Sequence, residues 1–173
     1  MEKDSIRDLI LTAFSKVNRP GNWALVDNRE GDEPLYVEEE FQDKDDWRTI
    51  DPAFLEEAPK GFRSALSFFS NEAFRYFLPA YLIADLDGKL YEVDPSYYLC
   101  SGLDNASKNE KVNPRRFGDQ TWLHVRQWRF SLFTKEEAKA ILEYLKYKSA
   151  ISTDFSKQQI LEAIENYWDY RAK

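Results

Sequence analysis

Cysteine and histidine are almost missing from this sequence, which has one of each, Cys100 and His124, in 173 residues. A single cysteine excludes an internal disulfide and is typical of a reducing compartment, so we expect a cytoplasmic protein. One cysteine and one histidine are also too few ligands for an ordinary zinc site. Nothing in the sequence places them together as a nucleophile and its base, so we interpret them as a buried thiol and a hydrogen-bonded histidine. The sequence predicts no catalytic residues.

Long apolar stretches and clustered glycines are missing as well. The roughly 18 consecutive apolar residues of a membrane-spanning helix occur nowhere, and the charged start, MEKDSIRDL, lacks the apolar part of a signal peptide. The six glycines stand singly, and no phosphate-binding glycine motif is present. The segment Ile83–Asp94 matches part of a calcium-binding loop, but Ile83 stands where the first carboxylate ligand is required. We therefore predict no membrane association, no cofactor and no metal.

Apolar and aromatic residues, in contrast, are plentiful. They make up 43% and 16% of the chain. This is enough material for a buried core, and a chain of this length is typical of one domain. We expect a single folded domain over residues 1–173.

Charge is unevenly distributed along the sequence. The chain carries a net charge of -7, and the segment Asp27–Asp51 alone holds 11 acidic and 3 basic residues. The segment Lys108–Arg129 has the opposite balance, with 6 basic and 2 acidic residues. Because an acidic protein repels phosphate backbones, the overall charge argues against nucleic-acid binding.

The acidic segment has two interpretations. A run of charge is most often a solvated face, and Glu38–Glu40 would then simply face water. Alternatively, the segment is a docking surface for a basic protein, because opposite charge accelerates encounter and selects the partner. The candidate residues for this role are five carboxylates: Glu38, Glu39, Asp43, Asp45 and Asp46.

The stretch Ser70–Gly88 has the most apolar bulk and predicts the central helix. Apolar residues recur at intervals of three and four from Phe74 to Leu86, Ser70 is a helix-capping type, and Gly88 can end a helix. The dipeptide Asp87-Gly88 between apolar flanks is also a hairpin signal, so residues 81–93 are alternatively two strands. We favour the helix because the spacing of three and four persists.

Pro79 lies inside this predicted helix. There it removes the hydrogen bond to the carbonyl of Arg75 and costs about 3 kcal/mol unless something compensates. The simplest outcome is a kink that wraps the helix around the core. The alternative is a pocket beside the kink, in which Arg75, Tyr76 and Tyr81 orient a small molecule.

Helical patterns also precede and follow the central stretch. An apolar stripe predicts a helix over Ile6–Val17, and a proline in the first turn favours another over Pro34–Phe41. Capping boxes predict helices that begin after Thr134 and Ser156. The predicted fold is therefore mainly α, a single-domain helical bundle with a proline-kinked central helix and room for a small β element.

The segment Trp122–Arg129 interleaves aromatic and basic residues and is compatible with a helix capped by Asp119 or with a strand. Such a mixture can stack the bases of single-stranded nucleic acid. The acidic balance of the chain favours instead a core face of tryptophan and valine, with the arginines extending to solvent or to the acidic segment. We therefore expect no nucleic-acid partner.

Three blocks of the sequence resemble a family of uncharacterised bacterial proteins. They are FRYFLPAYL (Phe74–Leu82), FTKEEAKAILEYL (Phe133–Leu145) and ILEAIENYW (Ile160–Trp168). The resemblance covers most of the chain in order. It implies a bacterial cytoplasmic protein and carries no activity or catalytic residues with it.

Two functions are compatible with these observations. We favour a non-enzymatic protein-binding module whose acidic segment meets a basic partner, for example an immunity-type protein that neutralises a cationic bacterial toxin. The alternative is a small-molecule-binding protein or enzyme with a pocket near Pro79. We prefer the first because the sequence assembles no set of acid, base and nucleophile.

Overall fold

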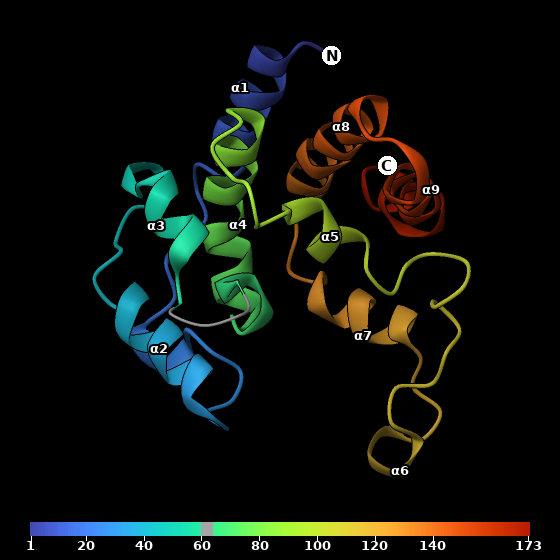
Figure 1. Cartoon of the computed structure of the whole chain (residues 1–173), viewed down its shortest axis with the longest axis horizontal. Coiled ribbons are helices and arrows are strands. Elements are labelled where there is room, and N and C mark those ends of the chain that lie inside the picture. Colours follow the sequence, from blue (N-terminus) through green and yellow to red (C-terminus); the bar gives the residue numbers. More distant parts are fainter. Residues whose placement is uncertain (60–63) are drawn as a thin grey trace. The chain divides into compact units, whose positions relative to one another are not determined.

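The computed structural model describes residues 1–59 and 64–173, apart from the side chain of Asp154, and consists mainly of helices (Figure 1). Among the described residues, β structure is limited to two isolated antiparallel bridges, Val26 with Phe69 and Lys111 with Thr121. The mainly α prediction is confirmed, and the expected small β element is no more than these bridges. In the same residues, no helix has the length and apolar character that crossing a membrane requires.

The chain divides into two compact units. We call Ile10–Pro95 the α4 unit, and Met1–Leu9 with Ser96–Lys173 the α8 unit. Helix α1 (Lys3–Ala13) has residues in both. That residues 1–173 behave as one domain stays a prediction.

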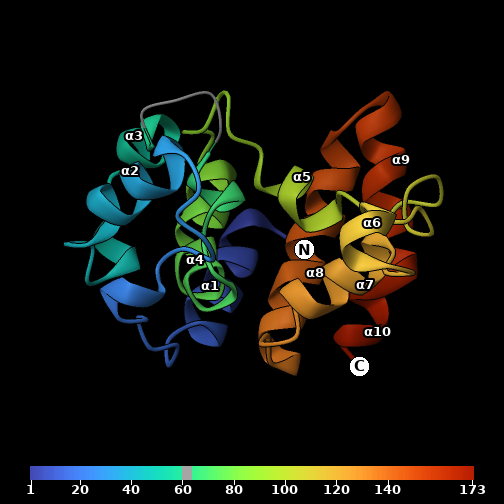
Figure 2. The ribbon, with the colours of Figure 1, turned by 90° about the horizontal axis from the view of Figure 1, so that it is seen from below.

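The α4 unit contains three further helices, α2 (Asp32–Phe41), α3 (Pro52–Glu57) and α4 (Asn71–Leu86). It also has three 3₁₀ turns, at Asn22–Ala24, Trp47–Thr49 and Ala65–Ser67. Helix α3 and the turn Trp47–Thr49 both pack against α4. Figures 1 and 2 show α2 beside α3.

Helix α4 forms the core of its unit, as the central-helix prediction required. Twelve of its 16 residues are buried, including Pro79. The hydroxyl of Ser70 accepts a hydrogen bond from the Ala73 amide at 3.0 Å and donates one to the Ala24 carbonyl at 2.6 Å. The helix ends before Gly88, whose φ of +68° is a left-handed conformation that favours glycine. The hairpin alternative for residues 81–93 is therefore wrong.

Four phenylalanines from different segments meet in this core. Phe41 of α2 lies 5.0 Å from Phe54, 4.9 Å from Phe69 and 5.0 Å from Phe77, measured between ring centroids. Phe69 and Phe77 are stacked at 5.1 Å. These aromatic contacts fix α2 and α3 against α4.

The α8 unit contains the later helices. They are α5 (Pro95–Cys100, whose first residue belongs to the α4 unit), α6 (Pro114–Phe117), α7 (Trp122–Arg129), α8 (Lys135–Ile151), α9 (Asp154–Ala163), a π-helical segment (Ile164–Trp168) and α10 (Asp169–Arg171). Helix α8 packs against both α9 and the π-helical segment (Figures 1 and 2). Trp168 is fully buried, and its indole N–H donates to the Leu99 carbonyl at 3.0 Å.

The predicted starts of the last two long helices had different outcomes. The capping box of α8 is confirmed, because the Thr134 amide donates to Glu137 at 3.1 Å and the Glu137 amide donates to the Thr134 hydroxyl at 3.2 Å. Helix α9 instead follows Thr153 as its cap, so Ser156 lies inside the helix and its predicted capping role is wrong. Thr153, three residues before Ser156, is also a residue type that is common at the start of a helix.

The segment Trp122–Arg129 is helix α7, so the strand alternative is wrong. Its cap is Thr121 rather than Asp119, and the Thr121 amide donates to the His124 ring at 3.1 Å. The prediction of a hydrogen-bonded histidine is thereby confirmed, as is that of a buried Cys100. The predicted core face is wrong, because no residue of α7 is buried and Trp128 is 60% exposed.

Candidate functional site

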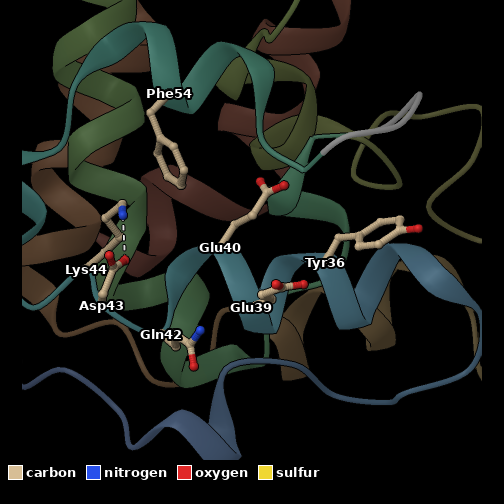
Figure 3. A pocket seen from close by; sticks show the side chains of 7 residues that line it. All are labelled: Tyr36, Glu39, Glu40, Gln42, Asp43, Lys44 and Phe54. Atoms are coloured by element: carbon tan, nitrogen blue, oxygen red, sulfur yellow. Dashed lines mark hydrogen bonds and ion pairs between the residues drawn. The ribbon is translucent and has the colours of Figure 1, made fainter.

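A groove between α2 and α3 is the candidate site, and we call it the acidic groove (Figure 3). Its volume is about 540 Å³. The lining comprises three carboxylates, an amide, an ammonium and two aromatic rings, from Tyr36, Glu39, Glu40, Gln42, Asp43, Lys44 and Phe54. In Figure 3 Phe54 projects from α3 toward α2, Glu40 extends from α2 into the space beneath α3, and Lys44 and Asp43 stand at one end.

The helical repeat of α2 explains this lining. Pro34, Val37 and Phe41 recur at intervals of three and four and are buried. Tyr36 and Glu40 share the same spacing on another face, so the polar side chains are directed away from the core. Glu39 is exposed, whereas Glu40 is half-buried, so the expectation that the whole acidic run faces water is only partly met.

A lysine of the chain itself occupies one end of the groove. The ammonium of Lys44 donates to the Asp43 carboxylate at 2.5 Å and lies 4.7 Å from the centroid of the Phe54 ring. This contact with Lys44 lowers the pKa of Asp43 below its ordinary value. The groove thus already shows how a cation is held, between a carboxylate and an aromatic face.

Arg19 fixes the chain that follows α2. Its guanidinium donates hydrogen bonds of 2.7–3.0 Å to five oxygens, the carbonyls of Pro20, Phe41, Gln42 and Lys44 and the side chain of Asn22. A helix leaves its last carbonyls without internal partners, and Arg19 supplies partners at the end of α2. It also lies 3.6 Å from the carboxylate of Asp45. The position of residues 42–46, which we call the acidic loop, therefore depends on this arginine.

The five predicted partner-binding carboxylates are brought into one unit but not into one site. Glu39 and Asp43 line the acidic groove. Asp45 is 87% exposed in the following loop, while Asp46 caps the turn Trp47–Thr49 and pairs with Arg48 at 3.0 Å. Glu38 pairs with Arg29 at 2.7 Å. The structure does not test whether any of the five binds a partner.

The pair formed by Glu38 and Arg29 predicts a pH dependence of stability. Arg29 donates twice, at 2.7 and 2.9 Å, and these contacts lower the pKa of Glu38 from 4.5. Because the pKa of Glu38 is lower in the folded than in the unfolded chain, the ion pair stabilises the fold at pH values above the unfolded-state pKa. This stabilisation is lost as the pH falls through the folded-state pKa.

We therefore expect the wild type to lose stability more steeply than Glu38→Gln as pH falls below about 5. Urea midpoints measured at a series of pH values check this. Parallel curves for the two proteins would show that the pair contributes nothing measurable.

The three predicted ligand-binding residues beside Pro79 do not line the acidic groove. Tyr76 is 4% exposed and donates its hydroxyl hydrogen to the Asp45 carbonyl at 2.6 Å, and burial raises its pKa. Tyr81 is fully buried and Arg75 is half-buried. Tyr76 thus supports the acidic loop, and the small-molecule role of these residues stays a prediction.

Sequence reasoning missed four residues that shape the groove: Arg19, Tyr36, Lys44 and Phe54. The spacing of Tyr36 and Glu40 on a predicted helix was a usable signal for a shared face. Phe54 reaches the groove through the tertiary arrangement of α3, and Arg19 reaches the chain after α2 from the segment NRPGN (Asn18–Asn22) that follows α1. No local pattern indicates either contact.

The groove combines carboxylates with aromatic rings, which is the chemistry that binds cationic side chains. In the described part of the chain, no three histidine, cysteine or acidic residues gather in the way that would hold a metal ion.

No curated protein and no solved structure is significantly similar to the chain. The expectation of an uncharacterised family is confirmed: residues 2–172 match the model of a family of unknown function, and the chain belongs to that family, DUF6714.

Proposed function

We propose that this protein is a non-enzymatic binding module whose acidic groove receives lysine or arginine side chains of a basic partner protein. A bacterial cytoplasmic protein that neutralises a cationic toxin is the concrete form that we favour. The charge of the segment Asp27–Asp51, 11 acidic against 3 basic residues, supports the choice of a basic partner.

The contact of Lys44 carries the proposal. The Lys44 ammonium contacts the Asp43 carboxylate and the Phe54 ring. A partner's cation would be bound in this groove by contacts of the same kind, with a carboxylate and an aromatic ring. A cation over an aromatic face gains about 0.5–1 kcal/mol at an exposed site and more when water is excluded. At the other end, Tyr36 is 40% exposed and Glu39 is exposed, so an aromatic ring and a carboxylate are accessible there.

Binding of short labelled peptides tests this function. We expect arginine-rich and lysine-rich peptides to bind the full chain, and an acidic peptide of equal length not to bind, in fluorescence anisotropy. Affinity for the basic peptides should fall when NaCl is raised from about 50 to about 300 mM, because salt screens exposed charges.

Charge reversal locates the binding. We expect Glu39→Lys to weaken the basic peptides by about tenfold, and more than the matched change Glu165→Lys on the exposed surface of the α8 unit. Equal losses in the two variants would mean that only net charge matters. If the affinity for the basic peptides changes neither with salt nor in Glu39→Lys, the proposal is overturned.

A further inference from the structure

Arg126 of helix α7 is a half-buried cation held in a fixed position. Its Nε–H donates to the Ser101 carbonyl at 2.7 Å. Its guanidinium carbon lies 5.8 Å from the centroid of the Trp122 ring, one helical turn earlier. The hydrogen bond and the ring together leave the side chain little freedom.

Gly102 allows this close approach. Its φ is +79°, a conformation that other residues rarely adopt. A Cβ atom there would lie 3.1 Å from Cβ of Trp122 and 3.4 Å from Nε of Arg126. A side chain at residue 102 would crowd Trp122 and strain the backbone, so glycine favours the close packing of the loop after α5 on the arginine.

Nothing acidic neutralises this arginine within the described residues 1–59 and 64–173. Its hydrogen bond goes to a neutral carbonyl, and no carboxylate is among the groups that act on its charge. Burial lowers the pKa of Arg126, and the nearby phenol of Tyr97 opposes this change. In that part of the chain the two terminal nitrogens of the guanidinium have no hydrogen-bond acceptor.

We propose that Arg126 binds a phosphate group through these two nitrogens. A planar guanidinium matches two oxygens of an oxyanion with parallel hydrogen bonds, and partial burial strengthens such charged contacts. The excess of basic residues over Lys108–Arg129 favours an anion at this place.

The phosphate group can come from the free ion or from a nucleotide, and a titration separates the two. We would follow the side-chain Nε–Hε signal of Arg126 by NMR while adding inorganic phosphate or adenosine monophosphate to the full chain at constant ionic strength. We expect a saturable shift with a dissociation constant of about 10 mM or tighter. If adenosine monophosphate binds about tenfold more tightly than inorganic phosphate, the ligand of Arg126 is a nucleotide. If the two bind equally, the ligand is the free ion.

Two variants keep the inference falsifiable. Arg126→Lys retains the charge but loses the paired geometry, and we expect it to weaken binding by about tenfold or more. Arg115→Lys on the exposed helix α6 is the matched control and should bind normally. If Arg126→Lys fails to fold, as circular dichroism would show, the wild-type titration decides alone. Absence of a saturable shift, or an equal loss in Arg115→Lys, would overturn the proposal, and neither result bears on the acidic groove in the α4 unit.

Discussion

Replacing Arg19 with alanine is expected to lower the free energy of unfolding by about 3 kcal/mol. The change removes five hydrogen bonds and leaves the carbonyls of Phe41, Gln42 and Lys44 without this donor. The Arg19 side chain is 15% exposed, so water would restore these contacts only in part. A lysine ammonium lacks the planar set of donors with which the guanidinium bonds several carbonyls at once. Arg19→Lys should therefore recover little of the lost stability.

Urea unfolding followed by circular dichroism measures this effect. Arg48→Ala is the matched control from the same segment, because Arg48 is 40% exposed. Its ion pair with Asp46 and its hydrogen bond to the Ser15 carbonyl are both exposed, and its guanidinium lies 4.8 Å from the centroid of the Trp47 ring. We expect that control to cost less than about 1 kcal/mol. Similar losses in Arg19→Ala and Arg48→Ala would show that Arg19 does not hold the acidic loop.

Truncation of Phe77 to alanine should cost even more, about 3–5 kcal/mol. The ring is fully buried and lies 5.0 Å from Phe41, 5.1 Å from Phe69 and 4.9 Å from Tyr76. Its removal leaves a cavity at the point where α2 meets α4, and surrounding side chains can fill it only partly.

The free energy of unfolding and the urea dependence of unfolding would be measured together. Phe155→Ala provides the control, because that ring is 78% exposed and its loss should change stability by less than about 0.5 kcal/mol. A cost below about 1 kcal/mol for Phe77→Ala would contradict the description of α4 as the core of its unit.

Local signals predicted the helices whose ends are set by local hydrogen bonds. Ser70 caps α4, and Thr134 and Glu137 cap α8 through contacts within one turn of helix, so the sequence alone indicates them. The end of α4 at Gly88 follows in the same way from the conformational freedom of glycine.

Helix α7 shows where such reasoning fails. Its apolar residues suggested a core face, yet none is buried, because burial depends on what the rest of the chain places against a helix. Its cap is Thr121 rather than Asp119, and both residues are good caps in isolation. Local preference could not choose between two neighbouring candidates.

The candidate site was predictable only in its charge. The acidic segment indicated Glu39 and Asp43, which do line the groove. Phe54 and Arg19 contact residues that lie far from them in the sequence. A local sequence pattern does not indicate such contacts. The charge of a surface is thus easier to predict than its shape.

NMR mapping of a basic peptide tests the role of the acidic groove most directly. The backbone amide signals of the isotope-labelled full chain would be followed while an arginine-rich peptide is added. We predict that the largest shifts fall on Tyr36, Glu39, Asp43 and Phe54, with the same saturation curve for each. Shifts spread evenly over all acidic surfaces, or absent from α2 and α3, would contradict the assignment of this groove as the binding site.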